Sequence, residues 1–312
     1  CARAQCPPEL TLLLTILLEQ IAPILLAAGA GFAVGRAYKI DLKAVSRIIF
    51  YIFSPCLVFT SFTESNLNGE QFGRMAAFTA GTVLVLGLAA FLFGRLMRLE
   101  RHALAGLVVI NMFGNGGNYG LPLNLFAFGE TALAWATIYY VVSTALVYTV
   151  GIVVASSGRA TLRQALSGVF KVPMIYGLIL AIVMRVAGVE LPPTIFRAVK
   201  LLSQAALPVM LVVLGLQLAE VKRPQNLRLV TAASVFQLIS GPVVGLTLAA
   251  LLGLSGPARQ AAVVEASMPT AVITTIIAVE YNIDPVFVTG VVLVTTLLSP
   301  ITLTPLIAYL QL

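Results

Sequence analysis

Residues 111–122 read NMFGNGGNYGLP and lie inside an otherwise apolar run. They contain four glycines, three asparagines and one proline. In a helix interior, a glycine costs about 1 kcal/mol and a proline about 3 kcal/mol relative to alanine. We therefore predict that the helix formed by this run breaks near its middle. In a membrane, such irregular backbone persists only where it is buried in protein or lines a cavity.

A second interruption lies in the other half of the chain, where residues 265–271 read EASMPTA. Pro269 lacks a backbone N–H, so one carbonyl group near the middle of that run loses its partner. Ala103 to Asn115 can be laid on Ala258 to Thr270 at a constant offset, which places Gly114 opposite Pro269. Small residues and proline kinks also serve ordinary helix packing in membranes. Two matching interruptions, one in each half, are instead typical of transporters built from repeats.

The composition of the whole chain is that of a membrane protein. Of its 312 residues, 59% are hydrophobic and 10% are charged, whereas soluble domains carry about 25% charged residues. The mean hydropathy is +1.00. A membrane-crossing helix needs about 20 apolar residues, so we expect an all-α polytopic membrane protein with ten transmembrane helices. The expected spans are 12–35, 45–63, 73–97, 102–128, 130–155, 173–188, 195–219, 228–253, 258–280 and 285–310.

These ten spans divide into two sets of five, and an odd number of crossings inverts the second set in the membrane. The motif IIFYIFSP at 48–55 also reads like LLSQAALP at 201–208. We therefore expect two inverted five-helix repeats in which the fourth and ninth helices are broken. The predicted organisation is a first repeat over 1–155, a cytoplasmic amphipathic linker over 156–172 and a second repeat over 173–312.

The distribution of positive charge along the chain indicates its orientation in the membrane. The net charge is +7, but the 19 Lys and Arg residues are unevenly distributed among the predicted connections. Thirteen lie on the connections 1–2, 3–4, 5–6 and 7–8, and six lie on the other side. Cytoplasmic loops are the richer in Lys and Arg, so we expect a multi-pass protein of the cell inner (plasma) membrane with both termini outside. This interpretation leaves no role for nucleic acid as a partner.

The two interruptions predict a substrate site in the middle of the membrane. A helix that restarts after a break presents free N–H groups and the positive end of its dipole, which favour an anion. The half-helices before the breaks end in carbonyl groups, which favour a cation. The residues expected to contact an anionic substrate are Gly114, Asn115, Asn118, Pro269 and Thr270.

Glu265 is the candidate coupling residue. It lies some seven residues into the ninth span, and an ionisable group inside a membrane is a functional hypothesis by default. We expect Glu265, together with Asn111, to take a sodium ion or a proton. The alternative is an interfacial carboxylate that pairs with Arg259.

The remaining polar residues give no support for an enzyme. No Gly-x-Ser-x-Gly, His-Glu-x-x-His or Cys-x-x-Cys motif occurs in the sequence. His102, the single histidine, is expected at the cytoplasmic start of the fourth span as an interfacial residue. Cys1, Cys6 and Cys56 have neither the number nor the spacing of a metal site or disulfide framework. Pairing of Cys1 with Cys6 stays open, and we expect no cofactor apart from the coupling ion.

The motifs also resemble those of the auxin efflux carrier family. The resemblance rests on Asn115 to Leu123, Ala266 to Thr270, Glu280 to Pro285 and Ser299 to Leu303, and it covers the chain from Leu18 onward. It implies that the broken helices cross and that the protein is a homodimer. It also implies a moving transport part, built from helices 3–5 and 8–10, that slides against a scaffold of helices 1, 2, 6 and 7.

Residue by residue, the crossover asparagine of the family falls on Asn115 and its crossover proline falls on Pro269. Gly114 stands where plant members have a proline, and the connection between spans five and six is short. Both departures fit a bacterial member, for which the resemblance implies carboxylates such as malate or malonate. Glu265 also matches a sodium-ligating glutamate of the similar bile acid sodium symporters.

The sequence therefore predicts a secondary active transporter of small organic anions that works by alternating access. Coupling to sodium or to protons is expected, because a cation bound beside the anion lowers the cost of carrying charge through a low-dielectric interior. The alternative function is an uncoupled anion uniporter or channel with the same cavity.

Overall fold

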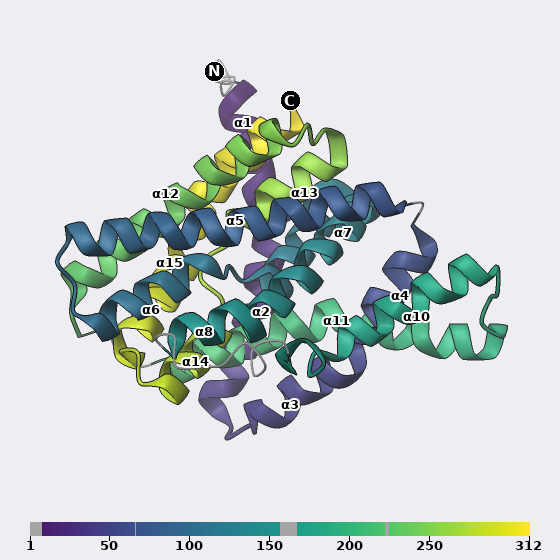
Figure 1. Cartoon of the computed structure of the whole chain (residues 1–312), viewed down its shortest axis with the longest axis horizontal. Helices are drawn as coiled ribbons and strands as arrows, with labels where there is room; N and C mark the ends of the chain where they lie inside the picture. Colours follow the sequence, from purple (N-terminus) through teal and green to yellow (C-terminus); the bar gives the residue numbers. More distant parts are fainter. Residues whose placement is uncertain (1–7, 66, 157–166, 222–224) are drawn as a thin grey trace, which may run out of the picture.

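The computed structural model of the chain describes residues 8–65, 67–156, 167–221 and 225–312 (Figure 1). Every regular element in these ranges is a helix. Seven of the described helices are long and apolar enough to cross a membrane, which confirms the all-α membrane class. Cys1, Cys6 and most of the predicted linker lie outside the described residues.

The first half of the chain forms three long rods, one long helix and one broken helix. Its elements are α1 (Pro8–Thr15), η1 (Ile16–Ile21), α2 (Ala22–Ala37), α3 (Leu42–Ile48), η2 (Ile49–Phe53), α4 (Ser54–Glu64), α5 (Gly69–Leu96), α6 (Arg101–Met112), η3 (Gly116–Gly120), α7 (Leu121–Leu146), η4 (Val147–Gly151) and α8 (Ile152–Ala155). The elements η1, η2 and η4 are π-helical turns that continue the rods without a gap. The π-helical turn η3 instead follows the non-helical residues after Met112. Asn68 caps α5 in a capping box with Gln71, which satisfies backbone donors at that helix start.

The second half of the chain is also helical throughout its described elements. Its elements are α10 (Pro173–Ala187), α11 (Pro193–Glu220), α12 (Leu227–Leu251), α13 (Gly256–Ala266), α14 (Ile273–Tyr281) and α15 (Pro285–Gln311). Several of these helices begin with a proline in the first turn, where its missing N–H is not needed. The helix α10 has 15 residues, fewer than the roughly 20 that a perpendicular crossing needs.

Gly129 divides the longest helical segment into two parts. The segment Gly116–Ala155 has 40 residues, about twice what a membrane crossing requires. At Gly129 the backbone turns to φ 80° and ψ −171°, a conformation outside the helical region. Only glycine adopts this region readily because it has no Cβ. The residues before Gly129 therefore form a short half-helix, and those after it form a full-length rod.

The helices pack as two groups. In one group, α11 lies along α2 and α4, and α10 packs on α4. In the other group, α5, α6, α7, α12, α13 and α15 pack on one another. Figure 1 shows α4 and α10 together at one edge of the molecule, away from α6 and α15. The helices α2 and α11 approach so closely that a Cβ at Gly215 would overlap the carbonyl oxygen of Ala28.

The two ends of the described chain lie at the same end of the molecule. The first helix, α1, contacts α15, and Figure 1 shows the two close together. Many side chains on the outer faces are large and apolar, among them Leu180, Val183 and Val186 of α10, as expected for helices surrounded by lipid.

Candidate functional site

The two interrupted helices meet where the sequence departs from helical preference. The helix α6 ends at Met112 and η3 begins at Gly116, while α13 ends at Ala266 and α14 begins at Ile273. The Asn115 N–H donates to the Pro269 carbonyl at 2.7 Å, and the Ala271 N–H donates to the Phe113 carbonyl at 2.9 Å. An antiparallel bridge between Gly114 and Thr270 lies between these bonds. The two extended segments therefore satisfy each other's backbone groups, as a membrane interior demands.

Gly114 permits this close approach. A Cβ at Gly114 would lie 3.1 Å from both the Cβ and the carbonyl oxygen of Met268. Such contacts are tighter than most Cβ contacts in proteins, so Met268 would have to move by a few tenths of an ångström. A glycine at this position therefore allows the two extended segments of the crossing to hydrogen-bond.

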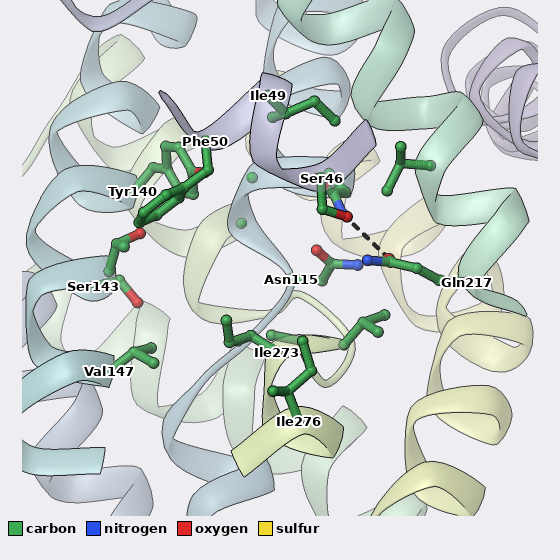
Figure 2. A pocket seen from close by; sticks show the side chains of 18 of the residues that line it. Ser46, Ile49, Phe50, Asn115, Tyr140, Ser143, Val147, Gln217, Ile273 and Ile276 are labelled. Atoms are coloured by element: carbon green, nitrogen blue, oxygen red, sulfur yellow. Dashed lines mark hydrogen bonds between the residues drawn. The ribbon is translucent and has the colours of Figure 1, made fainter. Parts of the chain in front are cut away.

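A cavity of about 170 Å³ opens beside the crossing. Figure 2 shows the ends of the Asn115 and Gln217 side chains close together on one side, with Ser143 and Val147 on the other side. The wall of the cavity comes from both helix groups, and none of its side chains is charged. It is lined by Ser46, Ile49, Phe50, Gly114, Asn115, Gly116, Gly117, Asn118, Tyr140, Ser143, Thr144, Val147, Tyr148, Val213, Gln217, Ala271, Val272, Ile273 and Ile276.

Asn115 and Asn118 supply amide groups to this cavity. Asn115 is 5% exposed, and its Nδ2 has no hydrogen-bond partner among the described residues. The Asn118 Nδ2 donates to Gln217 Oε1 at 3.3 Å, the bond that is dashed in Figure 2. A buried amide donor without an acceptor is costly, so Asn115 is suited to donate to a ligand.

Two helix starts also face the cavity. The π-helical turn η3 begins at Gly116 and α14 begins at Ile273, and both residues line the cavity wall. The first N–H groups of a helix have no acceptor within it. Together with the helix dipoles, they make the cavity attractive to a negative group although it holds no Lys or Arg.

Pro269 and Thr270 lie at the crossing but outside the cavity lining. The Pro269 carbonyl accepts the Asn115 N–H. Thr270 is 0% exposed, and its Oγ1 donates to the Ile110 carbonyl at 3.3 Å. Its N–H donates to Thr295 Oγ1 at 3.3 Å. These contacts make both residues part of the support of the crossing rather than part of its open face.

Glu265 lies behind the cavity wall in the protein interior. Its side chain is 0% exposed, and its Oε1 accepts a hydrogen bond from Asn124 Nδ2 at 3.1 Å. Its Oε2 has no partner in the described part of the chain. Arg259 does not neutralise it, because the guanidinium donates to Tyr309 Oη at 3.1 Å and lies over that ring. The alternative of an interfacial Glu265–Arg259 pair is therefore wrong.

Asn111 is also fully buried, but its amide is tied to its own helix. Its Nδ2 donates to the Leu107 carbonyl at 2.8 Å, and its Oδ1 has no partner among the residues that the structure describes. Within those residues, no group of three or more His, Cys, Asp or Glu side chains is placed to hold a metal ion. His102 lies at the exposed start of α6, where its Nδ1 is 2.8 Å from the Asn282 carbonyl oxygen.

Asn124 is a site residue that local sequence patterns do not identify. It is fully buried in α7, and its Nδ2 contacts both the Gly120 carbonyl at 2.9 Å and the Glu265 carboxylate. Around this position the sequence shows only an asparagine four residues after Gly120 in an otherwise apolar half-helix. Its partner lies 141 residues away in the sequence, so no local pattern reveals the pair.

A second, larger cavity of about 1050 Å³ lies between α2, α4, α7 and α11. One face of α11 between Lys200 and Val212 lines this cavity, whereas Val213 and Gln217 of the same helix line the smaller one. Lys200 and Glu64 form an ion pair at its wall. The two cavities thus lie at successive levels along α11.

Comparison with known proteins gives a consistent result over nearly the whole chain. A profile of the family described as Membrane transport protein matches residues 16–307. An uncharacterized transporter of Methanocaldococcus jannaschii is 28% identical over 267 residues, which cover 82% of this chain and 86% of that protein. A Rhizobium meliloti protein named "Putative malonate transporter" is 28% identical over 84% of this chain and 85% of its own length. Auxin efflux carrier component 3 of Arabidopsis thaliana is 32% identical over 41% of this chain and 20% of that carrier.

Proposed function

The chain belongs to the membrane transport protein family that includes the auxin efflux carriers, and from this premise we propose that it is a secondary active transporter of small organic anions. The observation that carries the proposal is the unpartnered Asn115 amide at a cavity flanked by two helix starts. A carboxylate in the cavity accepts from the Asn115 side-chain amide and from backbone N–H groups in the first turn of η3 beyond Gly116, because the Asn115 and Gly116 N–H groups already have acceptors. Asn118 contributes when its bond to Gln217 opens, and Pro269 and Thr270 hold the crossing in shape.

The substrate class follows from the size and chemistry of the cavity. A volume of about 170 Å³ is smaller than the roughly 300–1,000 Å³ typical of sites for drug-sized ligands. Amide donors and helix starts bind carboxylates without a fixed positive charge. The relative named for malonate supports a short dicarboxylate, malonate or malate, as the substrate of this chain.

The architecture proposed for this function is ten transmembrane helices in two inverted repeats, with α6–η3 and α13–α14 as the crossing helices. The repeats cover 1–155 and 173–312, joined by the linker 156–172. The group of α2, α4, α10 and α11 is the scaffold, and the group that holds the crossing is the part that moves. We place the protein in the cell inner membrane as a homodimer with both termini outside.

Coupling to a cation is part of the proposal. Glu265 is a fully buried carboxylate without an ion-pair partner in the described ranges, and such a group requires neutralisation by a proton or a cation. An uncoupled uniporter or channel would also use the cavity. Saturation, counterflow and dependence on an imposed ion gradient separate the coupled carrier from these alternatives.

The experiment is ligand-induced thermal stabilisation of the detergent-purified protein with a panel of carboxylates, each with and without sodium. A ligand that binds the folded state raises its stability by mass action. We expect malonate or malate to raise the unfolding temperature of the parent but not of Asn115→Ala. Gln260→Ala is the matched control, because Gln260 donates to the Leu310 carbonyl away from the cavity. Stabilisation of Asn115→Ala equal to that of the parent would refute the substrate site.

A further inference from the structure

Glu265 and Asn124 form a pair of planar polar side chains in the interior of the protein. Both are 0% exposed. The Asn124 Nδ2 donates to Glu265 Oε1 at 3.1 Å and to the Gly120 carbonyl at 2.9 Å. The second bond requires a donor, so it fixes which end of the amide is the nitrogen. The carboxyl and amide groups are therefore joined by one hydrogen bond of known direction.

The other two oxygens of this pair have no partner. Glu265 Oε2 and Asn124 Oδ1 make no hydrogen bond within the described ranges. An ionised carboxylate and an amide oxygen both act only as acceptors. A buried acceptor without a donor costs about 1–3 kcal/mol. One added donor shared between Oε2 and Oδ1 would satisfy both atoms.

The surroundings of the carboxylate favour a proton over a metal cation in this role. A Cβ at Gly120 would lie 2.5 Å from Oε1 and 2.7 Å from Oε2, and one at Gly116 would overlap Oε2. The carboxylate thus contacts the backbone CH2 groups of two glycines. Hard metal cations take several oxygen ligands around them. A proton needs only a single acceptor, which Asn124 Oδ1 offers.

The charged groups on the packed helices do not neutralise Glu265. The helix α13 packs against α5, α7, α12, α15 and η3. The titratable groups on these elements include the phenols Tyr139 and Tyr140 of α7 and Tyr119 of η3. The phenol of Tyr309 in α15 accepts a hydrogen bond from Arg259. The charged side chains on these elements lie toward helix ends or at the Gly129 turn: Glu70, Arg74 and Arg95 of α5, Glu130 of α7 and Arg228 of α12.

We infer that Glu265 carries the coupling proton on Oε2 and that Asn124 is its positioning residue. The protonated Oε2–H donates to Asn124 Oδ1 while Nδ2–H donates to Oε1, which closes an acid–amide ring of two hydrogen bonds. This inference rests on the proposed function for its role in coupling. The inference identifies the coupling ion as a proton and adds Asn124 to the residues that bind it.

The position of the pair explains how the proton and the substrate would be coupled. Gly116 lines the cavity and also contacts the Glu265 carboxylate, so a single turn of η3 separates the carboxylate from a bound anion. An ionised Glu265 repels that anion in a low-dielectric interior. Protonation therefore strengthens anion binding, and by linkage the anion strengthens proton binding by the same factor.

The first test needs no substrate. Infrared spectra of the purified full-length protein are recorded as a function of pH. We expect the C=O band of a protonated buried carboxyl, its loss in Glu265→Gln, and a shift in its frequency and titration in Asn124→Leu. Gln260→Leu, an amide variant on the same helix α13, leaves the band unchanged. A protein with no such band at any pH, or with a band that survives Glu265→Gln, would overturn the inference.

The second test measures malonate binding over a pH range in which both malonate carboxylates stay ionised. The malonate Kd of the parent rises with pH by up to about tenfold per pH unit, as expected when one proton is taken up with the anion. The Kd of Glu265→Gln is independent of pH, and Asn124→Leu shifts the profile. Binding that follows sodium at constant pH would overturn the proton assignment. If the infrared band is present but malonate does not bind, the proton site stands and the proposed substrate fails.

Discussion

Gly120→Ala tests the packing of Glu265 against the broken helix. The added Cβ would lie 2.5 Å from Glu265 Oε1, 2.7 Å from Oε2 and 2.8 Å from Cδ. All three contacts are closer than real Cβ atoms show, so the carboxyl must shift from the position in which it accepts from Asn124. Overpacking of this kind costs about 1–3 kcal/mol, while alanine in place of glycine in a helix contributes up to about 1 kcal/mol in the opposite direction. We expect a net loss of up to about 2 kcal/mol.

The assay is thermal unfolding of the purified variant compared with Gly73→Ala. Gly73 lies in α5, and a Cβ added there would have no atom of the described residues within 4 Å, so alanine at this position is neutral or stabilising. Removal of the Glu265 carboxylate creates the space that the new methyl group at position 120 lacks, so Gly120→Ala should cost less in a Glu265→Ala background. Double-mutant cycles between contacting residues show coupling energies of about 0.5–3 kcal/mol. Equal unfolding temperatures for Gly120→Ala and Gly73→Ala, or strict additivity with Glu265→Ala, would refute the packing argument.

Three further predictions concern the rest of the fold and the cavity. Gly215→Ala should destabilise the protein more than Gly120→Ala, because its Cβ meets backbone rather than a side chain; an unchanged unfolding temperature would contradict the close α2–α11 contact. Gln217→Leu removes the hydrogen bond between Asn118 and Gln217, and such a bond contributes about 0.5–1.5 kcal/mol. The malonate Kd should therefore change by up to about tenfold. A Kd equal to that of the parent, measured by calorimetry, would exclude a role for this bond. Lys200→Ala should cost less than about 1 kcal/mol, because the Lys200–Glu64 pair is solvent-exposed; a larger loss in a thermal melt would show that the pair is structural.

Much of the helical organisation could be predicted from hydropathy and from glycine and proline positions. The cost of glycine in a helix predicts the interruption at residues 111–122, and α6 ends at Met112. The second interruption is predicted at Pro269, and α13 ends at Ala266. Both predictions depend on local backbone preference, which the sequence carries directly.

The details of the site could not be predicted in the same way. Nothing local indicates that Thr270 bonds to the Ile110 carbonyl, or that Asn124 reaches Glu265. These contacts join residues that are more than a hundred positions apart, and they depend on how the two halves pack. The π-helical turn η2 also escapes prediction, because hydropathy does not distinguish it from a regular helix turn.

The most direct test of the central claim is uptake of labelled malonate into proteoliposomes that contain the purified protein, driven by an imposed pH gradient. The account predicts saturable uptake by the parent and by Gln260→Ala, a loss of uptake in Asn115→Ala, and loss of the gradient dependence in Glu265→Gln. Uptake by Asn115→Ala at the rate of the parent, with the same dependence on the gradient, would contradict the assignment of the crossing as the transport site.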